Sequence, residues 1–239
     1  MKTLTLLLFL SLLNLTACTT TSILSSNFET QTIGNLPAKN LPGNPSGDSL
    51  RYQAVLEPRL RVQASATSGE KALHFTQVAP AGELTAFNQW LSFRGVSTNF
   101  VEPLWFIWAG DLLNNGFADY TVYVTDGRGG IICGLIYGAT GNVSLLASRG
   151  GAEVIGNLPA GMRHTVIVSL NPASSSYNLT IFPKTGIRIE ALNKTVFVGS
   201  MLSYANPARP SVDMRFSDGT MNTNRFVIES VSITRKQPD

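Results

Sequence analysis

Hydrophobic and polar residues alternate in many short segments of the chain. The segments 120–125 (YTVYVT), 164–170 (HTVIVSL), 177–182 (YNLTIF) and 212–216 (VDMRF) each have one apolar face. A period of two is typical of half-buried antiparallel strands, and the polar stretch NPASSS should join the middle two segments as a hairpin. Gly, Asn, Asp and Pro separate the runs, and the best helical candidate, 187–194, is too short to be stable alone. The pattern predicts an all-β domain with little helix.

The last segment with this alternation, 226–234 (FVIESVSIT), changes its parity in the middle. The apolar residues are Phe226 and Ile228 before the change and Val231 and Ile233 after it. One extra residue would return all four side chains to the same face of the sheet. The sequence therefore predicts a β-bulge near Glu229 and Ser230.

The first 17 residues have the features of a secretory signal peptide. Lys2 supplies one positive charge, and a mostly apolar run follows from Leu4 to Leu15. This run is shorter than the roughly 20 residues that a membrane-spanning helix needs. An ordinary signal peptide and an uncleaved signal anchor remain the alternatives to the interpretation that follows.

The sequence Leu15-Thr16-Ala17-Cys18 resembles the lipobox of bacterial lipoproteins. The resemblance implies that residues 1–17 are removed and that Cys18 becomes a lipid-modified N-terminus, since two or more acyl chains anchor a protein stably. Residues 18–26 would then form the lipidated cysteine and a tether, and residues 27–239 a single β-sandwich domain. The expected location is the cell envelope, with the membrane as a partner; in a Gram-negative source, Thr19 in place of Asp favours the outer membrane.

Composition narrows the chemistry further. Without residues 1–17 the chain has 222 residues, enough for one large β domain, and its net charge of +2 does not indicate a nucleic-acid partner. If Cys18 carries lipid, Cys133 has no disulfide partner, and its apolar surroundings predict a buried, inert thiol. With two histidines and no Cys-x-x-Cys motif, we predict no zinc site and no cofactor. Calcium stays possible through the aspartates of the central segments.

Three segments resemble strands of concanavalin A-like and laminin G-like jelly rolls. They are NFETQTIGNLPA (27–38), MRHTVIVSLNPASSSYNLTIF (162–182) and NRFVIESVSITR (224–235). The resemblance implies an antiparallel jelly-roll β-sandwich of the concanavalin A-like type. Because that family includes lectins, glycan-binding modules, glycanases, lyases and adhesive domains, it does not select one activity.

The sequence offers little support for catalysis. Glycoside hydrolysis needs two carboxyl groups about 5–9.5 Å apart, and the closest acids along the chain, Asp213 and Asp218, do not form the Glu-x-Asp-x-x-Glu motif of sandwich hydrolases. Acids from separate strands remain an alternative: Glu102 with Asp111, Asp119 or Asp126. Those three aspartates are also the possible calcium ligands. No serine has glycine at both −2 and +2, so no nucleophile elbow is present.

The histidines are expected to be structural. Lyase chemistry of this fold would draw on His74 or His164, the latter beside Arg163. However, His164 shares the parity of the apolar residues that follow it, which favours a half-buried histidine at a strand end. We therefore name no catalytic residue.

All three tryptophans lie between residues 90 and 108 and are candidates for stacking on a sugar ring. We take Trp90, Trp105 and Trp108, with Asp111, as candidate binding residues. Trp105 and Trp108 have opposite parity, so at least one of them should lie in the core. The leading hypothesis is a non-catalytic recognition or adhesion module for a glycan or an envelope protein. A polysaccharide-degrading enzyme and a structural envelope lipoprotein without a small ligand are the alternatives.

Overall fold

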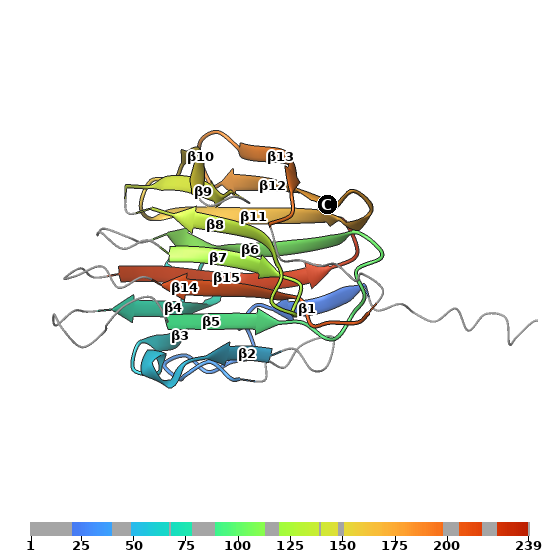
Figure 1. Ribbon diagram of the computed structural model, residues 1–239. Helices are drawn as coiled ribbons and strands as arrows, with labels where there is room; N and C mark the ends of the chain where they lie inside the picture. The colour runs from blue at the N-terminus through green and yellow to red at the C-terminus, as the bar shows by residue number, and fades with distance from the viewer. Residues whose placement is uncertain are drawn as a thin grey trace, which may run out of the picture.

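Two antiparallel β-sheets pack face to face and enclose one hydrophobic core (Figure 1). The computed structural model describes residues 21–39, 49–66, 68–77, 89–112, 120–138, 140–147, 151–197, 206–216 and 224–238. Sheet A has the order β13 (Ile189–Thr195), β12 (Ser176–Pro183), β11 (Met162–Asn171), β6 (Leu104–Leu112), β15 (Asn224–Thr234), β4 (Lys71–Gln77) and β3 (Leu60–Ala64), with β1 (Ser22–Ser26) also paired to β15. Sheet B has the order β10 (Ala152–Asn157), β9 (Asn142–Leu146), β8 (Ile131–Tyr137), β7 (Tyr120–Thr125), β14 (Ser211–Phe216), β5 (Gln89–Arg94) and β2 (Ser49–Tyr52). Within the described ranges, the helical elements are two 3₁₀ turns, η1 (Ala54–Leu56) and η2 (Pro172–Ser174). The prediction of an all-β chain with little helix is confirmed.

Alternation along the strands places every second side chain in the core. Val122 and Val124 of β7 are buried, whereas Tyr123 between them faces outward. On the neighbouring strand β14, Val212 and Met214 are buried. Full burial of a side chain of this size contributes about 1.5–3 kcal/mol, so the two inner faces together supply the main stabilising term.

The predicted bulge in β15 is confirmed. The register against β6 shifts between Ile228 and Ser230. The apolar side chains on both sides of the shift are buried: Phe226, Ile228, Val231 and Ile233. Glu229 sits in the bulge and reaches the side chain of Arg163 on β11.

The predicted hairpin is also present, as β11 and β12. Val166 pairs with Ile181 and Val168 with Leu179, and all four side chains are buried. The connecting turn η2 is capped by Asn171, whose side-chain oxygen accepts a hydrogen bond from the backbone N–H of residue 173. The segment 187–194, the best helical candidate, instead enters strand β13, because pairing with β12 satisfies its backbone.

The proposed tether at residues 18–26 is wrong for its second half. Ser22–Ser26 forms strand β1, which pairs with the C-terminal half of β15. Ile23 and Leu24 are buried in the core, and the backbone oxygen of Ile23 accepts a hydrogen bond from Val96. The folded domain therefore includes Ser22 and does not begin at residue 27. Burial of two large apolar side chains outweighs the cost of ordering so short a segment.

His164 is fully buried, not half-buried as the sequence suggests. Its Nδ1 lies 2.9 Å from the carbonyl oxygen of Met162, which can only accept, so Nδ1 carries the proton. Nε2, 3.0 Å from the hydroxyl of Tyr137, then accepts from that hydroxyl. Trp108 donates its indole N–H to the same Tyr137 oxygen at 3.4 Å. The neutral imidazole is thus the form that satisfies this buried network.

The expectation for Cys133 is confirmed as far as its environment is concerned. The side chain is free and completely buried among apolar residues of β8 and its neighbours. Burial raises the pKa of the thiol to about 12, so it is protonated at neutral pH and unsuited to nucleophilic attack.

Candidate binding site on sheet B

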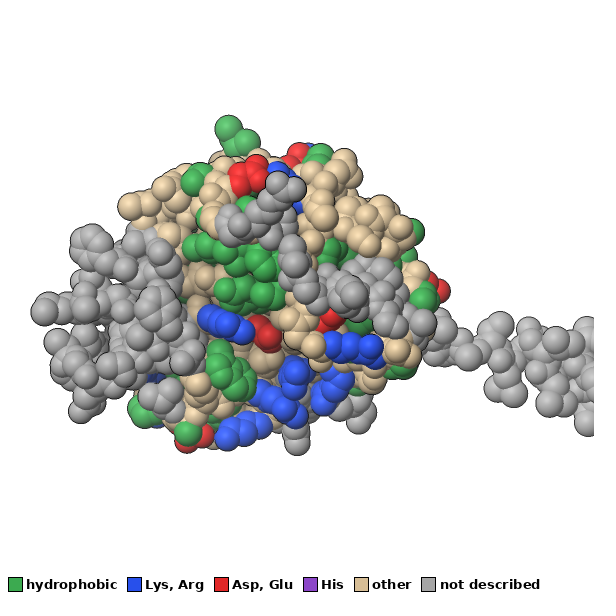
Figure 2. All heavy atoms as spheres, viewed as in Figure 1, with side chains coloured by type: hydrophobic (Ala, Val, Ile, Leu, Met, Phe, Trp, Pro, Cys, Tyr) green, Lys and Arg blue, Asp and Glu red, His purple; other side chains and the backbone are tan. Residues whose placement is uncertain are grey.

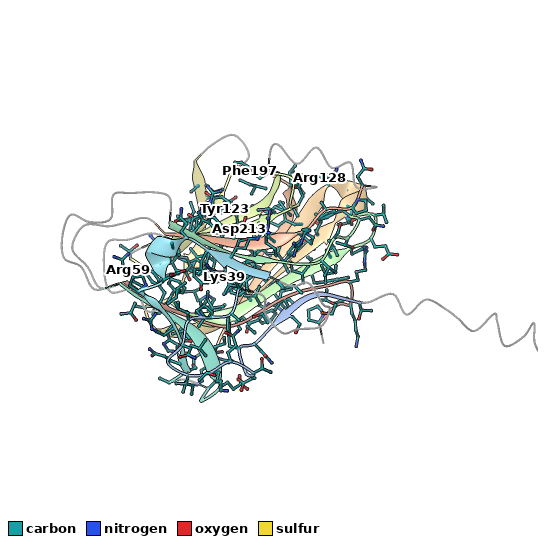
Figure 3. The ribbon with its side chains drawn as sticks, turned by 90° about the horizontal axis from the view of Figure 1, so that it is seen from below. Lys39, Arg59, Tyr123, Arg128, Phe197 and Asp213 are labelled. Atoms are coloured by element: carbon teal, nitrogen blue, oxygen red, sulfur yellow. The ribbon has the colours of Figure 1, made fainter. Side chains whose placement is uncertain are left out.

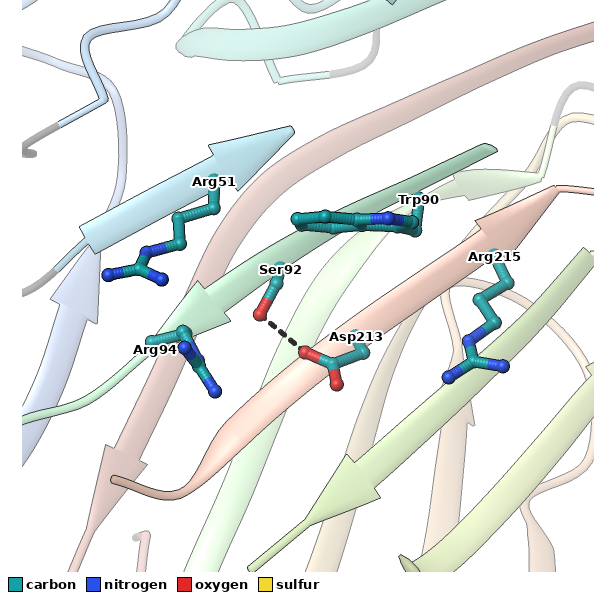
Figure 4. Close-up of a pocket in the computed structure, with 6 residues that line it drawn as sticks. All are labelled: Arg51, Trp90, Ser92, Arg94, Asp213 and Arg215. Carbon is teal, nitrogen blue, oxygen red and sulfur yellow. Dashed lines mark hydrogen bonds between the residues drawn. The ribbon is translucent and has the colours of Figure 1, made fainter. Parts of the chain in front are cut away.

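A pocket with a volume of about 320 Å³ lies on the outer face of sheet B. Three adjacent strands, β2, β5 and β14, supply its lining (Figure 4). The lining residues are Arg51, Trp90, Ser92, Arg94, Asp213 and Arg215. They occupy the outward positions of these strands because the residues that alternate with them are buried in the core.

Strand register sets four of the outward side chains in a row. Ser92 lies opposite Arg51 on one side and opposite Asp213 on the other. Tyr123 of β7 lies opposite Asp213 and continues the row, and Figure 3 shows these two side chains next to each other on one layer. Neighbouring strands are about 4.7–4.9 Å apart, so this row spans about 14 Å.

Trp90 forms an aromatic plate at the edge of the row. Its side chain is 36% exposed, and it lies opposite Arg215 in the register of β5 and β14. Gln53 fixes the strand at this point, because its side chain accepts a hydrogen bond from the Trp90 backbone and its own N–H donates to the Trp90 carbonyl. The pocket therefore presents a flat apolar surface beside hydrogen-bonding groups.

Positive charge dominates the pocket. The guanidinium groups of Arg51, Arg94 and Arg215 surround the single lining carboxylate, Asp213, which accepts a hydrogen bond from the hydroxyl of Ser92 (Figure 4). Figure 2 shows Lys and Arg side chains gathered over this half of the face, with apolar side chains beyond them toward β7, β8 and β9.

The structure does not bring the predicted binding residues together. Trp90 lines the pocket, but Trp108 is only 4% exposed and packs in the core, in line with the parity argument. Trp105 is half-buried on the outer face of sheet A, on the opposite side of the sandwich. Asp111 lies on that same face, 5% exposed, opposite Arg163 on β11. The three tryptophans and Asp111 therefore do not form one site, and of the four only Trp90 lines the pocket.

The acids proposed to act as a catalytic pair are also scattered. Glu102 forms an ion pair with Arg235 at 2.9 Å. Asp126 is buried in the turn between β7 and β8, where its carboxylate accepts hydrogen bonds from the N–H groups of residues 128 and 130. Asp111 belongs to sheet A, and Asp119 lies outside the described residues. Over the described ranges, no group of three or more His, Cys, Asp and Glu side chains is arranged to hold a metal ion.

Sequence reasoning does not identify most of the pocket. Asp213 and Arg215 are the polar positions of the segment 212–216, which the alternation correctly predicts as a strand. Arg51 and Arg94 lie on strands outside the four segments of clear alternation. An outward arginine has no distinguishing pattern in a single sequence, and only the pairing of β2, β5 and β14 brings these charges together.

Comparison with known proteins supports the fold. The chain matches no family model and no curated protein sequence. A GH131 β-glucanase catalytic domain from Podospora anserina superimposes with a TM-score of 0.60 at 10% identity, covering 92% of this chain and 97% of that domain. Peanut lectin superimposes with a TM-score of 0.52 at 11% identity, covering 88% and 96%. A sialidase gives 0.55 at 10% identity, with 78% of this chain matched to only 17% of that protein.

The chain is thus an all-β, antiparallel jelly-roll sandwich of the concanavalin A-like type, as the sequence segments predict. In the part of the chain that the structure describes, no helix has the length and hydrophobicity to cross a membrane.

Proposed function

We propose that this protein is a glycan-binding module, anchored by lipid to the cell envelope, that binds its ligand on the outer face of sheet B. The observation that carries the proposal is the pocket itself: an exposed Trp90 beside guanidinium, hydroxyl and carboxylate groups on adjacent strands. Aromatic side chains offer apolar area at low entropic cost, and the polar groups around them can orient a hydroxyl-rich ligand. The similarity to a lectin and to a β-glucanase domain agrees with a glycan ligand.

Binding without cleavage is the favoured activity. Asp213 is the single carboxylate among the residues that line the pocket, whereas glycoside hydrolysis by the usual route needs two carboxyl groups on the same sugar linkage. Asp111 and Glu229 are buried acids of sheet A and so belong to the opposite face. They are not placed to complete a pair with Asp213.

A glycan array combined with an assay for released reducing ends tests the proposal. We expect the full chain to bind glycans without releasing sugar, and Trp90→Ala to weaken binding by about tenfold or more. Phe182→Ala is the matched control, because Phe182 is 42% exposed and lies on β12 of the other sheet. Release of reducing ends would establish a glycanase instead. Failure to bind any glycan would leave the structural envelope protein as the better hypothesis.

The proposed anchor is constrained by the position of β1. Three residues separate Cys18 from Ser22, the first residue of β1. Four residue steps span at most about 14 Å, so a lipid on Cys18 would hold this end of the sandwich close to the bilayer. We expect Cys18→Ser to prevent acylation and to release the protein from membranes in fractionation. A variant that still sediments with membranes at high salt would contradict the anchor.

A further inference from the structure

No described side chain neutralises the arginines of the pocket. Among the described residues, the five ion pairs join other side chains, and neither Arg51 nor Arg94 forms a hydrogen bond there. Asp213 lies in the same pocket, but it is not within ion-pair distance of any of the three guanidinium groups. Three positive charges therefore face one negative charge on neighbouring strands.

Strand pairing sets the positions of these three arginines on the sheet. Arg51 and Arg94 lie on adjacent strands and are diagonal neighbours, because Ser92 is the residue directly opposite Arg51. Arg215 lies over the ring of Tyr123, with its guanidinium carbon 4.8 Å from the ring centroid. This cation–π contact orients the third guanidinium group, and none of its N–H groups donates a hydrogen bond to another described residue.

Asp213, by contrast with the arginines, has a hydrogen-bond partner in the protein. Its carboxylate accepts a hydrogen bond from the hydroxyl of Ser92, a buried residue directly opposite on the neighbouring strand. This bond holds the carboxylate close to the surface of the sheet. Arg51 and Arg94 thus gain no partner from Asp213 in this arrangement. Like charges on neighbouring strands repel one another, and a bound anion would relieve the repulsion.

We infer that the pocket is selective for acidic glycans, in which a carboxylate or sulfate group meets the arginines while Trp90 covers the apolar face of the same or an adjacent sugar. The inference rests on the proposed function and specifies its ligand class. A guanidinium group offers two parallel N–H donors that match the oxygen atoms of a carboxylate or sulfate. Arg51, Arg94 and Arg215 provide three such forks within one pocket.

The test measures binding of the full chain to four polysaccharides by calorimetry. Polygalacturonate carries carboxylates, dextran sulfate carries sulfates, and laminarin and dextran are their neutral counterparts. We expect binding to one or both acidic polymers at least tenfold tighter than to the neutral ones, weakening steeply as salt is raised. The arm that binds more tightly identifies carboxylate or sulfate as the recognised group.

Variants separate a built site from general attraction to a polyanion. Arg51→Gln, Arg94→Gln and Arg215→Gln should each weaken acidic binding by about tenfold, and Trp90→Ala by a similar factor. Arg188→Gln is the matched control, because Arg188 also lies near an aromatic ring, that of Phe182, but is already paired with Glu190 at 3.1 Å. It should leave binding unchanged.

Each other outcome overturns the inference. Equal or tighter binding of neutral polymers, with the arginine variants unaffected, would refute acidic selectivity while leaving glycan binding intact. Acidic binding that Trp90→Ala leaves unchanged, or that Arg188→Gln weakens as much as the pocket arginine variants do, would indicate adsorption by net charge. No binding to any polysaccharide, on this panel or on the array, would refute both the ligand class and the proposed function.

Discussion

The charged residues on the outer faces of the two sheets differ in whether they have partners within the protein. On sheet A, Glu229 is 4% exposed and accepts hydrogen bonds from Ser65 and Ser68 on one oxygen and from Arg163, at 2.7 Å, on the other. On sheet B, the arginines of the pocket are partly or largely exposed and have no carboxylate within ion-pair distance among the described residues. The charged groups around Glu229 on sheet A bind one another and form a closed network, whereas the pocket arginines on sheet B have N–H donors that remain available.

The difference separates charges that the fold requires from charges that the fold leaves available. A buried charge destabilises the fold unless it is paired and hydrogen-bonded, so the network around Glu229 is required by the fold itself. An exposed charge without a partner stays hydrated, so it neither destabilises nor stabilises the fold appreciably. Two of the acidic residues that the sequence suggests for catalysis or metal binding already have partners within the protein, Asp126 in its turn and Glu102 in an ion pair with Arg235.

The largest effect should follow from breaking the closed network. Glu229→Ala leaves Arg163 without its carboxylate and Ser65 and Ser68 without their acceptor. We expect a loss of about 2–3 kcal/mol in the free energy of unfolding, at the low end for a buried pair because Arg163 is one-third exposed. Urea denaturation at neutral pH measures the change.

The control for this variant is Glu190→Ala. Glu190 pairs with Arg188 on an exposed edge of sheet A, and such pairs contribute about 0–1 kcal/mol. If both variants unfold at the same urea concentration, the network around Glu229 has no structural role and the contrast between the faces fails.

The free energy of unfolding should fall in two stages as the pH is lowered, through groups in the core and on sheet A. Burial lowers the pKa of His164, outweighing the opposite effects of the Met162 carbonyl and of Asp111, and it also lowers the pKa of His74. Both histidines are therefore neutral in the native state, and the stability that they contribute is complete above the unfolded pKa of about 6.5 and falls as the pH decreases below it. We expect the free energy of unfolding to fall between pH 7 and pH 5, mainly through His164, because His74 is only half-buried.

A second stage should follow at lower pH. Burial alone would raise the pKa of Glu229, but hydrogen bonds from Ser65, Arg163 and Ser68 lower it below its ordinary value. Its contribution is present above about pH 4.5 and is lost as the pH falls through the lowered value. Urea midpoints for the wild type, His164→Gln and Glu229→Gln across pH 3–8 separate the stages. His164→Gln should lose the His164 share of the first stage and keep that of His74, and Glu229→Gln should lack the second stage. A wild-type midpoint that stays constant from pH 7 to pH 5 would contradict the first stage.

The sequence predicts the fold better than the site for a physical reason. Core positions recur with a period of two because a sheet buries one face, and this period makes β7, β11, β12, β14 and the bulge in β15 recognisable from the sequence alone. Strand β1 is not recognised in this way, because a segment of five residues with only two apolar side chains, Ile23 and Leu24, resembles a polar tether. Its place depends on pairing with β15, more than 200 residues later in the sequence.

The pocket depends on such pairings entirely. Trp90 is the one sequence candidate among the lining residues, and its neighbours in the pocket cannot be named from the sequence. Arg51 and Asp213 are separated by most of the chain and become neighbours of Ser92 only through the strand order β14–β5–β2. Trp105 and Trp108, close to Trp90 in the sequence, point to other faces because β6 belongs to sheet A.

A smaller effect tests the sign of the charge in the pocket. Asp213→Asn keeps an oxygen that accepts from Ser92 but removes the only negative charge among the lining residues. If the ligand is acidic, its affinity should rise by about threefold to fivefold, because a repulsion is removed. Glu153→Gln, which removes an equal charge on the edge strand β10, should change little. A loss of affinity in Asp213→Asn would mean that the carboxylate accepts hydrogen bonds from a neutral ligand.

The smallest expected effect is the one that most directly distinguishes the two faces. Arg51→Gln should leave the free energy of unfolding within about 0.5 kcal/mol of the wild type, because Arg51 has no partner among the described residues. Any change at low salt should be stabilising, because the substitution removes the repulsion between Arg51 and its diagonal neighbour Arg94. Arg163→Gln, the same substitution on sheet A, should cost about 2–3 kcal/mol, because Glu229 would remain buried without a cation. Urea midpoints at low and high salt for the two variants give the comparison. If Arg51→Gln destabilises the fold as much as Arg163→Gln does, the pocket arginines are structural, and the separation between a closed face and an open face is lost.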